Sequence, residues 1–102
     1  MIEKTRFEFQ HGHYHLERES DGAGDTGGML NAVWLDENGD VQSERNVLEL
    51  GKACQVGSLF ARTNAKQDWW LTTPITRFLQ VDEEKNEFLF QTGNSVYIFR
   101  AR

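Results

Sequence analysis

The sequence predicts a single all-β domain over residues 1–102, either barrel-like or a compact sandwich of about six to eight antiparallel strands. Three observations support this fold class. Apolar and polar residues alternate with a period of two along much of the chain. Gly, Asn and Asp cluster between the alternating runs, where hairpins need turns. Hydrophobic residues make up 38% of the chain and aromatic residues 12%, which suffices for one modest core.

The segment FEFQHGHYHLE, residues 7–17, predicts the first hairpin. One straight strand would place apolar side chains on both of its faces, whereas a two-residue turn at His11-Gly12 gathers them on one face. In this hairpin Phe9 pairs with Tyr14, and Glu8 pairs with His15. The apolar face then holds Phe7, Phe9, Tyr14 and Leu16, and the opposite face holds Arg6, Glu8, Gln10, His13, His15 and Glu17.

Three residues of the polar face form a candidate metal site. Glu8, His13 and His15 would lie close together, and a carboxylate with two imidazoles is a plausible Zn²⁺ ligand set. A solvated polar face explains the same residues without any ligand. We therefore predict no metal and no other cofactor, and keep these three residues as the alternative.

The next segments predict a loop and a second hairpin. SDGAGDTGG, residues 20–28, is expected to form a flexible loop, because it lacks the Lys-Ser/Thr ending of a phosphate-binding P-loop. VWLDENGDVQ predicts a hairpin with a three-residue loop, in which Gly39 takes the left-handed position and Leu35 faces Val41.

The segment SERNVLELGKACQVGSLFART, residues 43–63, allows two interpretations. A short helix before Gly51 would be capped by Ser43 and would present Val47, Leu50, Ala53 and Cys54 on one side. Two glycines and the alternation Val56, Ser58, Phe60 favour strands from about Ala53 onward. We predict strands and keep the short helix within residues 43–52 as the alternative.

DWWLTTPITRF, residues 68–78, contains the candidate partner-binding surface. Because adjacent residues of a strand point to opposite faces, Trp69 and Trp70 cannot both enter one core unless a second layer covers the outer ring. Trp and Arg are enriched in interface hot spots, so Trp69, Trp70 and Arg77 are the predicted contact residues. Burial of both rings in a two-layer fold is the alternative.

The C-terminal part predicts a three-stranded meander. In EFLFQTGNSVYIF, Gly93-Asn94 suits a type II′ turn that sets Phe90 against Tyr97 and Phe88 against Phe99. Such cross-strand pairs stabilise a sheet.

A preceding turn over residues 83–86 closes the other hairpin of this meander. It sets Val81 against Phe88 and Leu79 against Phe90.

The C-terminal half resembles a group of small uncharacterised bacterial and phage proteins. The similarity rests on VGSLFART, DWWLTTPITRFL and FLFQTGNSVYIF, which match their Trp-x-Thr-Ser/Thr-Pro-Val/Ile and Phe-x-Thr-x-Asn-Ser-x-Tyr patterns. It covers Val56 to Phe99. The resemblance implies β structure and implies no particular activity, since none is assigned to that group.

Composition and charge argue against several classes of function. A net charge of −5 argues against a protein that binds nucleic acid by neutralising phosphates. A single cysteine, Cys54, suits a reducing compartment, and no signal peptide or apolar membrane span is expected, so a cytoplasmic location is predicted. No nucleophile–base arrangement stands out. We expect a non-catalytic module with a protein partner; a metal-dependent enzyme and a single-stranded nucleic-acid binder that stacks bases on aromatics are the alternatives.

Overall fold

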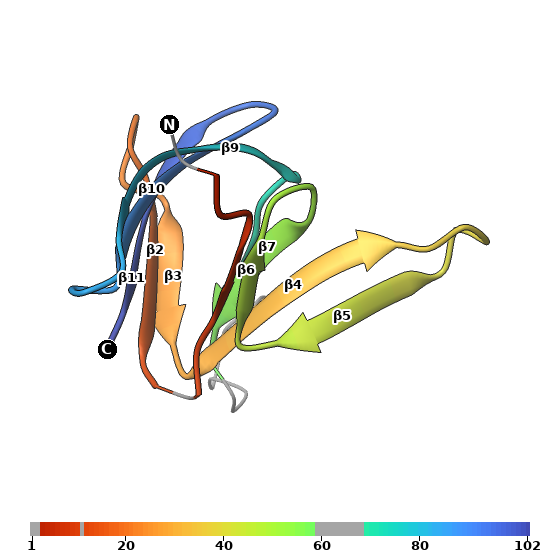
Figure 1. Ribbon diagram of the computed structural model, residues 1–102, viewed down its shortest axis with the longest axis horizontal. Helices are drawn as coiled ribbons and strands as arrows, with labels where there is room; N and C mark the ends of the chain where they lie inside the picture. Colours follow the sequence, from red (N-terminus) through yellow and green to blue (C-terminus); the bar gives the residue numbers. More distant parts are fainter. Residues whose placement is uncertain (1–2, 11, 59–68) are drawn as a thin grey trace.

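Antiparallel strands form nearly all of the regular structure in the computed structural model, which describes residues 3–10, 12–58 and 69–102 (Figure 1). The described residues contain eleven strands and no helix. These are β1 (Arg6–Glu8), β2 (Tyr14–Arg18), β3 (Gly24–Gly27), β4 (Met29–Leu35), β5 (Val41–Arg45), β6 (Val47–Glu49), β7 (Ala53–Gly57), β8 (Trp69–Leu71), β9 (Ile75–Asp82), β10 (Glu87–Thr92) and β11 (Val96–Ala101). The all-β prediction is confirmed, with more and shorter strands than the sequence suggested.

The strands form three sheets that pack as a sandwich and, as far as the described residues go, do not close into a barrel. A five-stranded sheet has the order β3-β2-β11-β10-β9, and a four-stranded sheet has the order β5-β4-β7-β8. The short pair β1-β6 completes the structure. Of the two architectures predicted, the sandwich is therefore the one observed.

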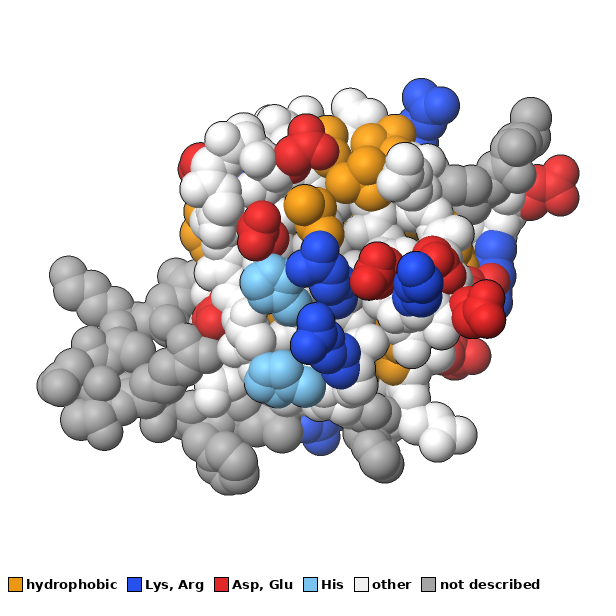
Figure 2. Space-filling view, turned by 90° about the vertical axis from the view of Figure 1, so that its left-hand side faces the viewer, with side chains coloured by type: hydrophobic (Ala, Val, Ile, Leu, Met, Phe, Trp, Pro, Cys, Tyr) orange, Lys and Arg blue, Asp and Glu red, His pale blue; other side chains and the backbone are white. Residues whose placement is uncertain are grey.

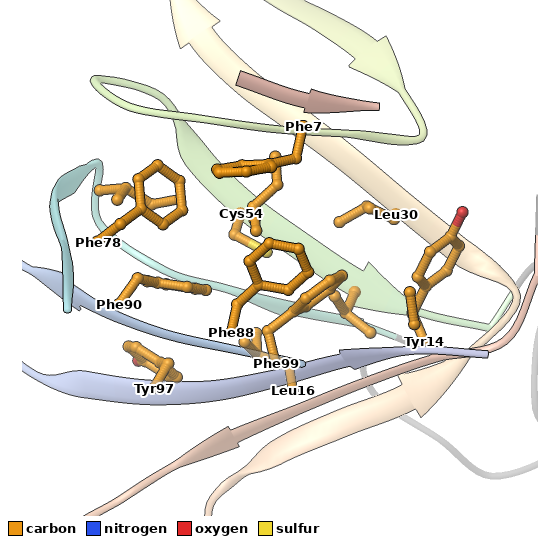
Figure 3. Packing of buried hydrophobic residues seen from close by; sticks show 14 residues of the cluster. Phe7, Tyr14, Leu16, Leu30, Cys54, Phe78, Phe88, Phe90, Tyr97 and Phe99 are labelled. Carbon is orange, nitrogen blue, oxygen red and sulfur yellow. The ribbon is translucent and has the colours of Figure 1, made fainter. Parts of the chain in front are cut away.

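Aromatic rings fill the space between the sheets (Figure 3). Phe7 lies between Phe78 and Phe88, with ring centroids 5.1 and 4.9 Å away in edge-to-face arrangements. Phe90 and Tyr97 stack at 5.7 Å across neighbouring strands. Such geometries add to the burial of apolar area, so these rings hold the sheets together.

Both cross-strand pairs of the C-terminal hairpin are confirmed. Phe88 lies opposite Phe99, and Phe90 lies opposite Tyr97. The turn differs from prediction, because Gly93 lacks the positive φ that a type II′ turn requires. The Thr92 hydroxyl, which accepts a hydrogen bond from the Ser95 N–H at 3.3 Å, stabilises the turn instead.

The preceding hairpin is half correct. Val81 faces Phe88 as predicted, but a register shift places Phe78 opposite Phe90 in the position expected for Leu79. The shift lets the larger aromatic side chain of Phe78 enter the core, where it is 7% exposed. Leu79 is left half-buried.

The hairpin of β4 and β5 is confirmed and extends away from the sandwich (Figure 1). Leu35 faces Val41, and Gly39 has a φ of 81°. One carboxylate oxygen of Asp36 accepts hydrogen bonds from the Asn38 and Asp40 N–H groups at 2.9 and 3.0 Å. These hydrogen bonds stabilise the loop.

The short helix considered for residues 43–52 is not formed, because β5 and β6 occupy that segment and Ser43 lies within β5. Asn46 separates the two strands with a φ of 60°, and its side-chain oxygen accepts a hydrogen bond from the Tyr14 hydroxyl at 2.9 Å. The strand prediction from Ala53 holds through Gly57, and Phe60 lies outside the described residues.

The N-terminal hairpin is wrong in its pairing and right in its apolar face. β1 pairs with β6, so that Phe7 lies opposite Leu48, while β2 pairs with β11 and β3. Phe7, Tyr14 and Leu16 are nevertheless buried, because alternation decides the face whichever strand is the neighbour. His11, the first residue of the predicted turn, lies outside the described residues.

The loop predicted over residues 20–28 is shorter than expected, since its second half forms β3 at the edge of the five-stranded sheet. A Cβ atom at Gly24 would lie 1.9 Å from the Leu16 carbonyl oxygen. Glycine at this position therefore allows β3 to approach β2 closely. The sequence analysis interpreted the glycines only as loop residues and missed this strand.

Candidate functional site

The structure separates the three predicted contact residues. Trp69 is exposed on β8, whereas Trp70 packs against the core and donates its indole N–H to the Tyr97 hydroxyl at 3.2 Å. The Arg18 guanidinium lies over the Trp70 ring at 5.1 Å from its centroid. Arg77 is exposed on the outer face of the other sheet, since it neighbours the inward-facing Phe78 and pairs with Gln91. Of the three predicted contact residues, only Trp69 is exposed on the outer face of the four-stranded sheet.

The outer face of the four-stranded sheet carries a concentration of apolar side chains. Leu35, Val41, Trp69 and Leu71 are 66, 70, 42 and 47% exposed, and they make up four of the five large hydrophobic residues exposed in the described chain. The register continues this surface through half-buried Met29 and Val33 of β4. We call the face formed by Met29, Val33, Leu35, Val41, Trp69 and Leu71 the apolar face.

Two amide side chains lie in the middle of the apolar face. Asn31 of β4 and Gln55 of β7 are cross-strand neighbours, and the Asn31 amide donates to the Gln55 side-chain oxygen at 3.1 Å. The Asn31 side-chain oxygen is buried and has no hydrogen-bond partner in the described structure. Leaving such an oxygen buried without a donor costs free energy.

The far end of the apolar face is acidic. The loop beyond Leu35 and Val41 contains Asp36, Glu37 and Asp40 and no cation. The Gln42 side chain donates to the Asp36 carboxylate at 2.8 Å, and this bond together with the loop N–H groups holds the pKa of Asp36 below its usual value. The loop therefore presents fixed negative charge beside exposed apolar side chains.

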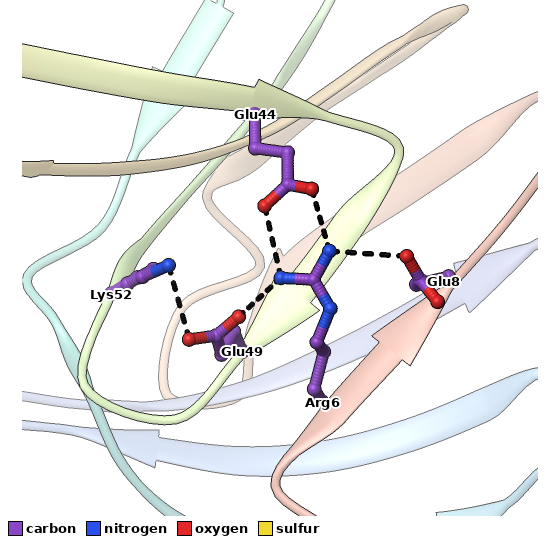
Figure 4. Close-up of polar contacts among 5 residues, drawn as sticks. All are labelled: Arg6, Glu8, Glu44, Glu49 and Lys52. Carbon is purple, nitrogen blue, oxygen red and sulfur yellow. Dashed lines mark hydrogen bonds and ion pairs between the residues drawn. The ribbon is translucent and has the colours of Figure 1, made fainter.

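A cluster of ion pairs supports the base of the protruding hairpin (Figure 4). Arg6 of β1 makes two hydrogen bonds to Glu44 of β5, at 2.9 and 2.5 Å, and one of 2.6 Å to Glu49 of β6. Glu8 contacts the same guanidinium at 3.0 Å, and Lys52 contacts Glu49 at 3.0 Å. The cluster thereby joins β1 to the consecutive strands β5 and β6, which lie much later in the sequence.

The cluster changes the pKa values of its carboxylates. The hydrogen bond from Arg6 holds the pKa of Glu44 below its usual value. Partial burial raises the pKa of Glu49, but hydrogen bonds from Arg6 and Lys52 outweigh it, so that the net shift is downward. Both lowered carboxylate pKa values predict stability that is present above pH 4.5, the ordinary glutamate value, and is lost as pH falls further.

The substitution Arg6→Met tests this cluster. At pH 7 the variant should unfold at lower urea concentration than the natural protein, because three carboxylates would remain close together without their common cation. Near pH 3.5 the difference should be smaller, since protonated carboxyls no longer need the guanidinium. Urea titrations at both pH values measure it, with Arg45→Met, an exposed arginine on the same hairpin, as the control. An equal loss at both pH values would contradict the assignment.

The predicted metal ligands are not brought together. Glu8 lies on β1 and contacts Arg6, whereas His13 and His15 belong to the β2 segment beside β11. Within the part of the chain that the structure describes, no group of three His, Cys, Asp or Glu side chains is placed to hold a metal ion. The prediction that Glu8 faces His15 is wrong because β1 pairs with β6.

The two histidines instead line a pocket with basic residues. His13, His15, Thr26, Arg100 and Arg102 surround an open hollow of about 300 Å³ on the outer face of the five-stranded sheet. The sequence did not predict this group, because only the pairing of β2 with β11 brings the histidines beside the arginines. The alternation along β11 could have indicated that Ile98, Arg100 and Arg102 share its outward face, but not that the histidines lie beside them.

The single cysteine is a core residue. Cys54 is buried on β7, and burial raises the pKa of its thiol.

Among the described residues there is no helix long and apolar enough to cross a membrane.

Comparison with known proteins returned no match to any protein-family model, to any curated protein or to any solved structure, so the resemblance seen in the sequence stays a prediction.

Proposed function

We propose that the protein is a non-catalytic module that binds a partner protein through the apolar face. The observation that carries this proposal is the gathering of four exposed large apolar side chains on one side of one sheet. Single exposed hydrophobic residues need no explanation, whereas several on one face, here with polar Asn31, Gln55, Ser43 and Arg45 between them, are typical of interaction sites. Trp69 and Leu71 lie at one end of the face and Leu35 and Val41 at the other.

The chemistry of the face favours a protein over a lipid surface. Apolar anchors with polar groups between them are typical of protein interfaces, and here the Asn31–Gln55 pair occupies the middle. The acidic loop at the end would be repelled by anionic lipid headgroups. The partner should therefore present an apolar patch with basic side chains at its edge.

Two finer proposals rest on the sequence. The single cysteine is unpaired and buried, which supports a cytoplasmic location. The similarity of the C-terminal half to bacterial and phage proteins supports an origin of that kind.

Among aromatic residues with a described environment only Trp69 is exposed, and a single ring offers little support for nucleic-acid binding by base stacking.

Photo-cross-linking tests the apolar face. A photoreactive amino acid placed at Leu35 or at Leu71, at opposite ends of the face, should capture the same protein in cells that produce this one. The same probe placed at Arg77, on the outer face of the other sheet, should not capture it. Capture of unrelated proteins from the two ends would contradict the proposal.

The captured partner then allows a quantitative test. Trp69→Ala should weaken binding at least about tenfold, roughly 1.4 kcal/mol, as expected for an interface anchor. This variant should remain folded, with a free energy of unfolding about 1–3 kcal/mol below that of the natural protein, because the side chain is 42% exposed and partly covered. Isothermal titration calorimetry measures the affinity, with Arg77→Ala as the matched control. If Arg77→Ala weakens binding as much as Trp69→Ala does, the apolar face is not the site.

A further inference from the structure

The pocket around the histidines has the composition of an oxyanion site. Figure 2 shows two histidine side chains beside basic side chains on this side of the molecule. The pocket is lined by His13, His15, Thr26, Arg100 and Arg102, and two carboxylates border it, Glu17 bonded to His15 and Glu87 opposite Arg100. We call the five lining residues the basic pocket. It lies on the outer face of the five-stranded sheet, whereas the apolar face belongs to the other sheet.

Strand pairing places the basic side chains in a compact array. Arg100 of β11 lies directly opposite His15 of β2, which in turn lies opposite Thr26 of β3. His13 and Arg102 form the next row, since each donates its main-chain N–H to the carbonyl of the other, at 2.9 and 2.8 Å. Neighbouring strands are about 4.8 Å apart, and side chains on one face repeat about every 7 Å. Two arginines and two histidines are thus within reach of one small ligand.

The arginines of the basic pocket keep their hydrogen-bonding capacity for a ligand. Arg100 is half-buried and Arg102 exposed, and neither forms an ion pair or side-chain hydrogen bond with any described residue. Arg100 remains unpaired although Glu87 lies opposite it on β10. Arg6 and Arg18, by contrast, are each bonded to carboxylates. The nitrogen atoms of Arg100 are not among the buried unpartnered atoms of the described residues, so they are open to an anionic ligand that can accept their hydrogen bonds.

His15 is held in place by its neighbours. Its Nδ1 lies 2.8 Å from the Thr26 hydroxyl, and its Nε2 lies 3.2 Å from the Glu17 carboxylate. Because a carboxylate only accepts hydrogen bonds, Nε2 carries a hydrogen and the orientation of the ring is fixed. His13 has no side-chain partner among the described residues and can turn toward a ligand.

We propose that the basic pocket binds the phosphate group of a small molecule, either a phosphomonoester or inorganic phosphate. A doubly charged tetrahedral group with several acceptor oxygens matches two guanidinium forks and the His13 imidazole, whereas a single carboxylate would use only one fork. The volume of about 300 Å³ accommodates a phosphate with a small substituent. The net charge of −5 does not draw anions to the protein, so recognition relies on these local hydrogen bonds.

Two-dimensional ¹H–¹⁵N NMR tests the proposal directly. Inorganic phosphate and glycerol 3-phosphate are titrated at constant pH and ionic strength. Both should give saturable shifts centred on His13, His15, Thr26 and Arg100, and the tighter of the two identifies the source of the phosphate. Acetate at the same ionic strength should bind at least about tenfold more weakly. Shifts that never saturate, or that acetate reproduces equally, would overturn the proposal.

Variants assign the effect to the basic pocket. Arg100→Ala should weaken phosphate binding about tenfold or more, and Arg100→Lys should weaken it less, because charge is retained while the fork is lost. Arg77→Ala, on the outer face of the same sheet, should leave it unchanged. If Arg100→Ala does not fold, Arg102→Ala at an exposed position provides the same test. Full phosphate affinity in a folded Arg100 or Arg102 variant would refute the site.

Discussion

Replacing Phe99 by alanine is expected to lower the free energy of unfolding by about 3–5 kcal/mol, which is the usual cost of removing a buried phenylalanine ring. Phe99 is fully buried on β11, a central strand of the five-stranded sheet. Its ring lies within 6.0 Å, centroid to centroid, of the rings of Phe9, Tyr14 and Phe88. Deletion would leave a cavity between aromatic side chains from three other strands or connections, which cannot all move to fill it.

Ile98 supplies the matched control. It is adjacent to Phe99 on the same strand but points to the outer face and is half-buried, so Ile98→Ala should cost about 1 kcal/mol. Because small domains have only about 5–15 kcal/mol of stability, Phe99→Leu, at about 1–2 kcal/mol, provides a milder variant should the alanine protein not fold. Urea titrations followed by circular dichroism measure all three. Equal losses for Ile98→Ala and Phe99→Ala would contradict the observed inward and outward assignment of β11.

The position of Phe99 illustrates which parts of the fold were predictable. Alternation along one strand is a local property, and it correctly identified Phe88, Phe90, Tyr97 and Phe99 as cross-strand neighbours around a short turn. The partner of β11 on its other side is β2, from the opposite end of the sequence. Hydrophobic alternation indicates which face is buried but not which distant strand lies alongside. The N-terminal hairpin was therefore predicted with the right faces and the wrong neighbours.

For the candidate surfaces, too, the sequence predicted the alternation of side chains along a strand but not which strands lie side by side. The opposite orientations of Trp69 and Trp70 followed from their adjacency, but which ring faces inward depends on the Tyr97 hydroxyl and on Val56 across the strand pair. The arrangement of Arg100 beside His15 depends entirely on the register between β11 and β2. Sites assembled from strands distant in sequence require that register, which the sequence alone did not provide.

Substituting Gly27 by alanine is the second change for which a large effect is expected. A Cβ atom built on Gly27 would lie 2.0 Å from the carbonyl oxygen of Gly57, 2.5 Å from its carbonyl carbon and 2.9 Å from the Ser58 nitrogen. Gly27 ends β3 in the five-stranded sheet and Gly57 ends β7 in the four-stranded sheet, so the two sheets meet at this contact. Backbone atoms cannot rotate away as a flexible side chain can. The free energy of unfolding should therefore fall by about 3 kcal/mol.

Gly93→Ala is the matched control for this substitution, because Gly93 has no positive φ and the nearest atom to a built Cβ is the Thr73 hydroxyl oxygen at 3.8 Å. Its effect should stay within about 0.5 kcal/mol. Gly27 also follows Thr26 of the basic pocket, while Gly57 pairs with Trp69 of the apolar face. Folded Gly27→Ala protein should consequently show altered NMR signals at both His15 and the Trp69 indole. Stability and signals like those of Gly93→Ala would mean that the two sheets do not meet through these glycines, and that the two surfaces are independent of each other.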